Sequence, residues 1–412
     1  MLKYMYMKRY KILPIIFILV MVVVSFYFLW GKFNSAKPAI LPSNKSITKI
    51  IENNNTPKTA INNTDFPLTL PKGFSIDVFA KNLNKVRVLK TDPNGTIVAS
   101  IIDKGKVVAL PDKNKDGKAD EEISIVENLN NPHGIEFKDN KIYIAETNAL
   151  AVFDYNSSDY KASNKQKLID LPGGGRHFTR TLLFNPKNSD ELLISIGSSC
   201  DVCIEQNGLR GTIQSYNIKT GELRQYAEGL RNSVFMTVKP DTQEVWATEM
   251  GRDNLGNNIP PDEINIIKEG SNYGWPYLYG KNQEDEKFPF PSEKDVKYGI
   301  YNVPSHINIQ AHSAPLGLAF IEENSDFPKD HWNNLLVSYH GSWNRTPPTG
   351  YKIERVVLDN EENEIRREDF ISGWLQSDNS SLGRPVDILI KDKKEIYISD
   401  DKAGVIYVVT YK

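Results

Sequence analysis

A strand–turn–strand pattern that recurs six times is the feature that most constrains the fold. In each unit, a short apolar run is followed by a polar turn and a second apolar run. Equivalent positions in the second runs are separated by 45, 51, 52, 90 and 61 residues, at Ile97, Ile142, Leu193, Val245, Leu335 and Ile396. Units of roughly 40–50 residues built from short strands are typical of β-propellers. The sequence therefore predicts an all-β, six-bladed β-propeller.

The two ends of the repeat region indicate how the ring closes. A spare apolar strand, Phe74–Phe79, precedes the first unit, and the last unit ends in Val405–Val409. Pairing of these two segments in one blade would protect the edges of both. The 90-residue spacing predicts an insertion in blade four, from Tyr279 to His312. A pair of β-sandwiches is the alternative architecture for residues 66–412.

The N-terminal region has the character of a membrane anchor. Ile12–Trp30 is a run of 19 residues without a charged side chain, just long enough to span a bilayer as a helix. It follows four basic residues, which favour the cytoplasmic side: Lys3, Lys8, Arg9 and Lys11. We therefore expect residues 1–33 to form a single transmembrane helix, with the rest of the chain outside the cytoplasm. A cleaved signal peptide is the alternative.

Residues 34–65 separate this helix from the propeller. The segment contains seven Asn and no aromatic residue, and cannot bury enough apolar surface to offset the entropy of ordering. We expect a flexible linker. The whole chain carries a net charge of −2, which argues against a nucleic-acid-binding protein.

Polar residues gather where the repeat places one rim of the propeller. The connection into each innermost strand and the turn after each second strand open on the same face. Four of the six His and three Arg occupy these connections: His133, His177, His312, His340, Arg176, Arg231 and Arg384. Any one of these His could be structural, but the set indicates a site. A concavity lined by His and Arg suits an anionic ligand and general-base chemistry near neutral pH.

Several motifs on this rim resemble one family. They are His177–Pro186, Gly229–Asn232, Asp262–Asn265 with Asn272–Pro276, and Gly383–Asp387 with Tyr397–Asp401. Together they are similar to segments of the glucose/sorbosone dehydrogenases, six-bladed quinoproteins that use pyrroloquinoline quinone (PQQ) and calcium. The likeness covers about residues 70–412. Three further segments look more like the sorbosone branch: Ser198–Cys203, Gly251–Asp253 and Pro260–Glu263.

The resemblance implies roles for individual residues. His177 would be the base that takes the substrate hydroxyl proton as hydride passes to the quinone. Arg231, with Asn232 beside it, would stabilise negative charge developing on the cofactor. Arg384 would pair with a cofactor carboxylate, which its planar fork suits.

The resemblance also implies two calcium sites. Backbone carbonyls of Gly251 and Arg252 would hold the ion that polarises the quinone. Asp262, Glu263 and Tyr273 would hold a second, structural ion.

The sequence departs from the family at four site positions. Arg176 replaces an Asp before the catalytic His, and Arg252 replaces a Pro of the calcium loop. His340 stands near a cofactor-contacting Lys of the family, and His133 near a Gln contact. We count Arg176, His340 and His133 as candidate cofactor contacts.

Three further motifs have competing interpretations. Asp112, Asn114 and Asp116 begin like a calcium loop, but Ile123 stands where the bidentate Glu would be, so an acidic hairpin turn is the alternative. Cys200 and Cys203 favour a local disulfide over zinc, since no second Cys pair exists. Asp400-Asp401 is either a metal site or a solvated turn.

The function that this sequence favours is PQQ-dependent oxidation of a sugar, a sugar aldehyde such as sorbosone, or a related alcohol. The enzyme would be anchored in the cell membrane and would pass electrons to an unidentified quinone or cytochrome. The alternatives are a calcium-dependent propeller hydrolase of the lactonase kind and a propeller that only binds ligands. A hydrolase needs carboxylate metal ligands at the channel centre, where this sequence is rich in Arg.

Overall fold

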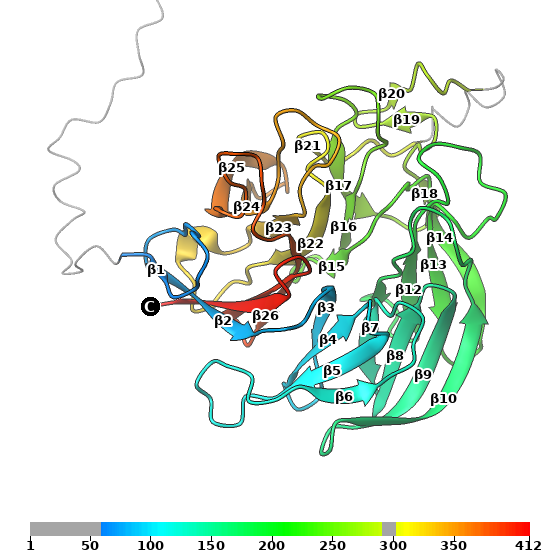
Figure 1. Cartoon of the computed structure of the whole chain (residues 1–412). Helices are drawn as coiled ribbons and strands as arrows, with labels where there is room; N and C mark the ends of the chain where they lie inside the picture. Colours follow the sequence, from blue (N-terminus) through cyan, green and yellow to red (C-terminus); the bar gives the residue numbers. More distant parts are fainter. Residues whose placement is uncertain (1–58, 291–301) are drawn as a thin grey trace, which may run out of the picture. The chain divides into compact units, whose positions relative to one another are not determined.

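The computed structural model describes residues 59–290 and 302–412. They form six blades, each a four- or five-stranded sheet, around a central channel, and the innermost strand of each blade contacts that of the next (Figure 1). The last contact joins β26 to β3 and closes the ring. The predicted all-β, six-bladed propeller is confirmed.

The first three blades follow the sequence in order. Blade one contains β3 (Val86–Thr91), β4 (Ile97–Ile101), β5 (Lys106–Leu110) and β6 (Ile123–Val126). Blade two contains β7 (Ile135–Lys138), β8 (Lys141–Glu146), β9 (Ala149–Asn156) and β10 (Lys161–Asp170). Blade three contains β11 (Leu182–Phe184), β12 (Glu191–Ile196), β13 (Thr212–Asn217), β14 (Leu223–Glu228) and the added edge strand β18 (Ser271–Asn272).

The last three blades include the insertion and the closure. Blade four contains β15 (Met236–Val238), β16 (Val245–Glu249), β17 (Asp262–Ile267) and β21 (Ile307–Ile309). Blade five contains β22 (Pro315–Phe320), β23 (Leu335–Tyr339), β24 (Lys352–Leu358) and β25 (Glu364–Ile371), with the short 3₁₀ helix η1 (Lys329–His331). Blade six contains β26 (Pro385–Lys391), β27 (Glu395–Asp400), β28 (Val405–Tyr411), β2 (Phe74–Ala80) and β1 (Ile61–Asn62).

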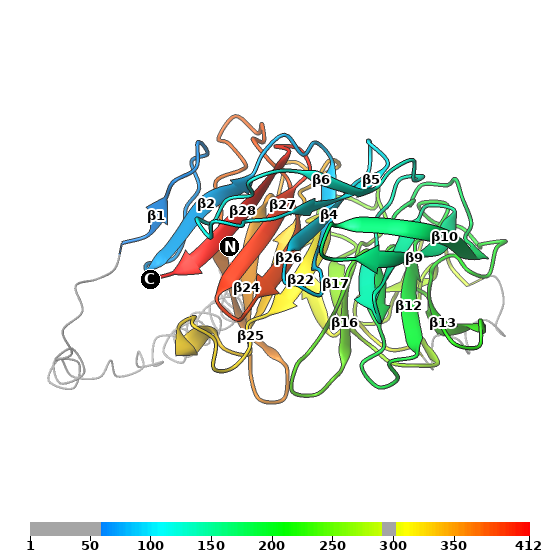
Figure 2. The same ribbon diagram turned by 90° about the horizontal axis from the view of Figure 1, so that it is seen from below.

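Blade six joins the two ends of the propeller chain. β2 pairs antiparallel with β28, from Phe74 opposite Tyr411 to Ala80 opposite Ile406 (Figure 2). This confirms the predicted closure. β1 then pairs in parallel with β2, and the Asn62 side chain donates hydrogen bonds to the Phe66 and Leu68 carbonyls. The end of the predicted flexible linker is therefore ordered, because this short segment finds backbone partners on the edge of the blade.

The insertion in blade four differs from its predicted bounds. It lies between β17 and β21, which pair with each other, and it includes β18 and the hairpin of β19 (Leu278–Tyr279) and β20 (Gln283–Glu284). The predicted segment Tyr279–His312 therefore started too late and included β21, a strand of blade four. A three-residue edge strand has too little apolar alternation to stand out in a sequence.

The core lies between neighbouring blades. Because each blade is covered on both faces, its middle strands include some that are buried along their whole length, as in β12 and β23. Trp246 and Trp374 are fully buried in two of these layers. In the described ranges, no helix is long and apolar enough to cross a membrane. The predicted anchor Ile12–Trp30 lies outside the described residues.

Candidate functional site

Loops that lead into the innermost strands surround a cavity of about 410 Å³ at the mouth of the channel. Its size is typical of a small-molecule site. Its polar lining includes four predicted site residues: Arg176, His177, Asn232 and His340. It also includes Lys85, Arg87, Asp103 and Asp401, so three cationic side chains stand with two carboxylates. The predicted rim is thus a concave site with one cationic group in excess.

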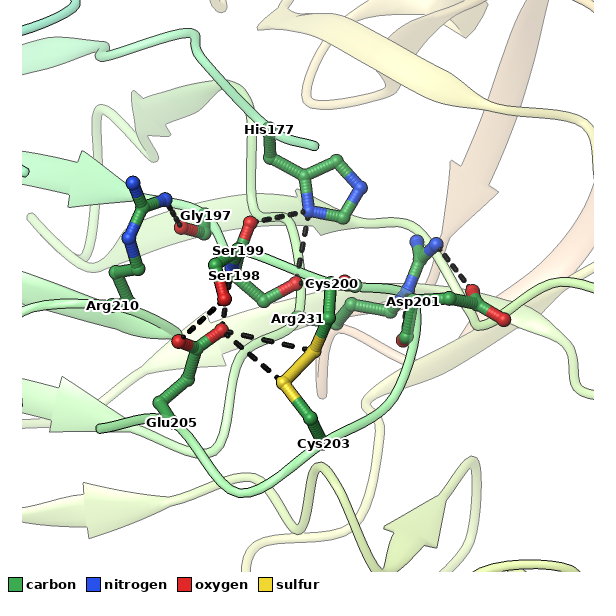
Figure 3. The surroundings of a disulfide bond; sticks show 10 residues. All are labelled: His177, Gly197, Ser198, Ser199, Cys200, Asp201, Cys203, Glu205, Arg210 and Arg231. Atoms are coloured by element: carbon green, nitrogen blue, oxygen red, sulfur yellow. Dashed lines mark hydrogen bonds and ion pairs between the residues drawn. A yellow bond between two sulfur atoms is a disulfide. The ribbon is translucent and has the colours of Figure 1, made fainter. Parts of the chain in front are cut away.

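The loop after β12 fixes the orientation of the His177 ring (Figure 3). His177 Nδ1 lies 3.0 Å from the Ser198 carbonyl oxygen and 2.9 Å from Ser198 Oγ. A carbonyl can only accept, and the Ser198 hydroxyl already donates to the Cys200 carbonyl at 2.6 Å. Nδ1 therefore carries the ring proton, and Nε2 is left as an acceptor.

The electrostatic surroundings keep this ring neutral. Burial, followed by the charges of Arg231 and Arg176, lowers the pKa of His177 from 6.5 to about 2. A neutral imidazole with a fixed tautomer is the form of His that can accept a proton from a ligand. An anionic ligand in the cavity would offset the two Arg charges and raise the basicity of His177.

Arg231 is buried beside the cavity and is held by protein acceptors. Its Nε and Nη2 donate to the backbone oxygen and Oδ1 of Asp201, both at 2.8 Å. Nη2 also lies 3.2 Å from Asp253 Oδ2, and Nη1 donates to the Met250 carbonyl. Arg231 therefore acts on the site through its charge on His177 rather than as a group lining the cavity.

Asp253 connects three blades around the rim. It accepts hydrogen bonds from Arg176 at 2.5 Å, from Arg231 and from Asn344 at 2.6 Å. Arg176 also lies over the ring of Trp343, whose side chain is 68% exposed. This network keeps Arg176 at the cavity wall, where it can meet a ligand.

A second His is fixed on the opposite wall. His340 Nε2 lies 2.9 Å from Asp401 Oδ1, and Arg87 donates to Asp401 Oδ2 at 3.0 Å. Burial opposes ionisation of Asp401, but His340 and Arg87 hold the pKa of this carboxyl well below its usual range. Burial lowers the pKa of His340 to about 4 in spite of Asp401. Neutral His340 therefore donates from Nε2.

Arg384 and His133 lie beside the cavity but do not line it. Arg384 Nε and Nη2 donate to the carbonyls of His340 and Gly341, both at 2.9 Å. His133 is 1% exposed, and its Nδ1 contacts Thr181 Oγ1 at 3.2 Å. His312, the fourth rim His, is held by the Gly256 carbonyl. Their roles as ligand contacts remain predictions.

The predicted calcium residues lie around a separate, small cavity of about 30 Å³ in blade four. Gly251, Arg252, Glu263 and Tyr273 line it, and Met250 lines both this cavity and the larger one. The Gly251 and Arg252 carbonyls accept no hydrogen bond from the described part of the chain. These carbonyls and the Glu249 and Glu263 carboxyls are the oxygen ligands that this cavity offers to a cation, while Arg231 and Arg252 also line it.

The acidic side chains of this region are already bound to the backbone. Asp262 accepts hydrogen bonds from the Gly251 and Ala314 amides, and Glu263 from the Gly280 amide and Asn265. Burial raises the pKa of Asp262 and of Glu263 to about 7. The Tyr273 hydroxyl donates to the Ile266 carbonyl. A second calcium ion here remains a prediction.

The other motifs lie outside the central cavity or on its edge. Asp112, Asn114 and Asp116 form an exposed loop between β5 and β6, where Asp112 accepts hydrogen bonds from two loop amides. Cys200 and Cys203 form a disulfide, as expected. The bond uses both sulfur atoms, which excludes the thiolates that zinc would need.

Sequence reasoning missed Lys85 and Arg87. Lys85 lies directly before β3, the innermost strand of blade one, and Arg87 is its second residue. His177 and Arg231 likewise lie close before the innermost strands of their own blades. Extending the same reasoning to the first unit would have identified both residues.

A sequence model of the TrAA12-like family matches residues 68–412. The chain belongs to the TrAA12-like family. An uncharacterized protein of Borreliella burgdorferi is 34% identical over 360 residues, which cover 84% of this chain and 91% of that protein.

Relatives with a stated enzymatic activity are less similar in sequence. The PQQ-dependent pyranose dehydrogenase of Coprinopsis cinerea is 21% identical over 408 residues, with 84% of this chain covered. This chain spans about half the length of that relative, since 54% of it is covered. The holo structure of its PQQ domain has a TM-score of 0.72 and 19% identity, and covers 85% of this chain and 100% of that domain. This TrAA12-like chain thus shares the propeller fold of that domain.

Proposed function

We propose that the protein is a PQQ-dependent dehydrogenase of a sugar or a sugar aldehyde. The observation that carries the proposal is a neutral His177, with Nδ1 fixed and Nε2 available, at the wall of a cavity with cationic groups. Membership of the TrAA12-like family and similarity to a PQQ-dependent pyranose dehydrogenase support the same reaction class.

The residues present suit PQQ, a planar anion with several carboxylates. Lys85, Arg87 and Arg176 supply positive charge in the cavity, and Asn232 supplies an amide. Buried Arg231 adds long-range charge without a direct contact. When bound, PQQ would supply the two-electron acceptor of the reaction, taking one hydride from the substrate carbon. The Gly251 and Arg252 carbonyls would hold calcium near the cofactor.

The protein's own contribution is to orient the substrate and accept its proton. His177 Nε2 would accept the proton of the hydroxyl at the carbon that is oxidised, while Ser198 keeps the ring in place. Phe178, which lines the cavity and is 42% exposed, and the exposed Trp343 offer apolar faces to a sugar ring. A sorbosone-like aldehyde, in its hydrated form, would present the same hydroxyl group.

The deciding experiment is reconstitution of the purified protein with PQQ and Ca²⁺. We expect saturable PQQ binding and reduction of an artificial dye with at least one member of a panel of aldoses, sorbosone and alcohols. The His177→Asn variant should reduce the dye about 10²–10⁴-fold more slowly and should still bind PQQ. His306→Asn is the matched control, because His306 does not line the cavity. No PQQ binding, or hydrolysis of lactones without dye reduction, would refute the proposal.

We also propose that residues 1–33 anchor this enzyme in the cell membrane with the propeller outside the cytoplasm. The support is the uncharged run Ile12–Trp30 and the basic residues before it. The full chain should then sediment with membranes and should not be extracted from them by alkaline carbonate. A variant without residues 1–33 should not sediment with membranes. Release into the medium of a shortened protein that lacks the N-terminal segment would contradict the anchor and favour a cleaved signal peptide.

A further inference from the structure

The loop segment from Ser198 to Glu205 contacts two side chains of the site, His177 and Arg231. It is part of the connection between β12 and β13 and contains both Cys of the chain, joined as the Cys200–Cys203 disulfide (Figure 3). Ser198 lies at its start and contacts His177, and Asp201 lies between the two Cys and contacts Arg231. The covalent ring Cys200–Cys203 therefore contains the partner of Arg231 and begins two residues after the partner of His177.

The contact with His177 depends on the position of Cys200. The Ser198 hydroxyl donates to the Cys200 carbonyl at 2.6 Å, which leaves its lone pairs to accept from His177 Nδ1 at 2.9 Å. If Cys200 moved, the Ser198 hydroxyl could turn and donate to His177 instead. The Ser198 carbonyl would then be the remaining Ser198 acceptor for the Nδ1 proton, and the tautomer of the ring would be held less firmly.

The contact with Arg231 depends on the disulfide more directly. Asp201 accepts from Arg231 with its backbone oxygen and with Oδ1, so both the main chain and the side chain must be in place. The same Oδ1 also accepts from the Asp253 amide at 2.8 Å. Asp201 therefore links the disulfide ring to the hydrogen-bond network of Arg231, Asp253 and Arg176.

The first half of the loop is held by hydrogen bonds, and the second half by the disulfide. The Ser198 amide donates to the Arg231 carbonyl, and the Ser199 carbonyl accepts from the Arg176 amide, both at 2.8 Å. Glu205 binds the Ser199 amide and hydroxyl. Between these anchors, the bond to Cys203 is the covalent constraint on Cys200 and Asp201.

We propose that the Cys200–Cys203 disulfide positions His177 and Arg231, so that the site is competent only when the two Cys are oxidised. The proposal rests on the proposed function, in which His177 is the base. Because the chain holds no third Cys, a thiol reductant acts on this bond alone. Dithiothreitol would transfer two electrons and two protons to the disulfide, giving two thiols and its own cyclic disulfide.

The test compares the oxidised protein with the Cys200→Ser/Cys203→Ser variant. We expect kcat for dye reduction to fall about 10- to 100-fold, since displacement of a reacting group by about 1 Å can have such an effect, with KM changed less than about threefold. The matched control is Ile204→Ser, which alters the same loop at a side chain that is 63% exposed and leaves the disulfide intact. Its kcat should equal that of the unaltered protein.

A second readout reports on the His177 ring without any turnover. In the oxidised protein, the Nδ1 proton donates to two oxygens of Ser198 and should give a slowly exchanging imidazole signal in NMR, assigned by its loss in His177→Asn. Exchange should become at least about tenfold faster in the double Ser variant, by the same loss of positioning. If this variant does not fold, the folded protein is reduced with dithiothreitol, desalted without oxygen and measured before and after reoxidation.

The two proposals fail in different ways. Unchanged kcat and unchanged His177 proton exchange after loss of the disulfide would overturn the positioning role. Absence of dye reduction by the oxidised, PQQ-loaded protein would instead refute the dehydrogenase function. In that case, faster His177 exchange on reduction would still support the positioning role, and unchanged exchange would overturn it.

Discussion

Gly197→Ala tests the close packing behind the candidate base. Gly197 follows β12 directly, and a Cβ atom placed on it would lie 2.7 Å from the Cβ of His177 and 2.6 Å from Asn232 Oδ1. Ordinary van der Waals contact begins at 3.4 Å, so the shortfalls are 0.7 Å and 0.8 Å. The methyl group can fit only if both cavity-lining residues move outward by most of these distances.

The expected effects on activity and on unfolding free energy are of similar size, since a 10²-fold loss of rate corresponds to about 2.7 kcal/mol. Overpacking of this kind costs about 1–3 kcal/mol of unfolding free energy. A base displaced by nearly 1 Å can lose roughly 10²-fold in rate, because proton transfer requires contact within hydrogen-bond range. We therefore expect Gly197→Ala to be folded but to have kcat about 10²-fold below that of the unaltered protein.

The assay is dye reduction by the PQQ-loaded protein, with urea unfolding measured in parallel. Gly208→Ala is the matched control, since a Cβ there would meet nothing within 4 Å. A Gly197→Ala protein with unchanged kcat would show that the His177 position does not limit the reaction, and would refute the reasoning. A loss of rate shared by Gly208→Ala would also contradict it.

Three further predictions concern stability. Phe74→Ala, at a side chain that is 1% exposed in the closing strand, should lower the unfolding free energy by about 3–5 kcal/mol in urea titrations; a loss under about 1 kcal/mol would show that β2 contributes little to closure. Asp401→Asn should cost about 3 kcal/mol at pH 7, because it leaves the buried Arg87 without a charged partner; equal midpoints of thermal unfolding would contradict this. His340 and His177 should contribute to destabilisation as the pH falls below about 6.5. The unfolded chain protonates its His near 6.5, whereas folded His340 and His177 do so only near 4 and 2, so the unfolded state binds more protons at these two sites. Asp262 and Glu263, whose pKa burial raises to about 7, contribute with the opposite sign, so the test isolates His340 by substitution. His340→Gln should flatten the fall of the melting temperature between pH 6.5 and 4, and an unchanged slope would refute the assignment.

The repeat and the closure were predictable from local patterns. Alternation of apolar runs and turns depends on neighbours along the chain, so six units and the pairing of Phe74–Phe79 with the last strand could be read directly. The same periodicity located His177 and His340 on the rim, because it identifies the connection in which a residue stands. The spacing of Cys200 and Cys203 likewise favoured the disulfide that forms.

The partners of the long cationic side chains were decided only by the tertiary structure. Arg87 meets Asp401, 314 residues away, and Arg231 meets Asp201 and Asp253 across two blades. These pairings withdraw Arg231 from the cavity, while Lys85 and Arg87 line it. A strand pattern specifies the position of a residue along the backbone, but not the position of the charged group at the end of a flexible side chain. That position depends on which hydrogen-bond acceptors the folded ring of blades brings within reach.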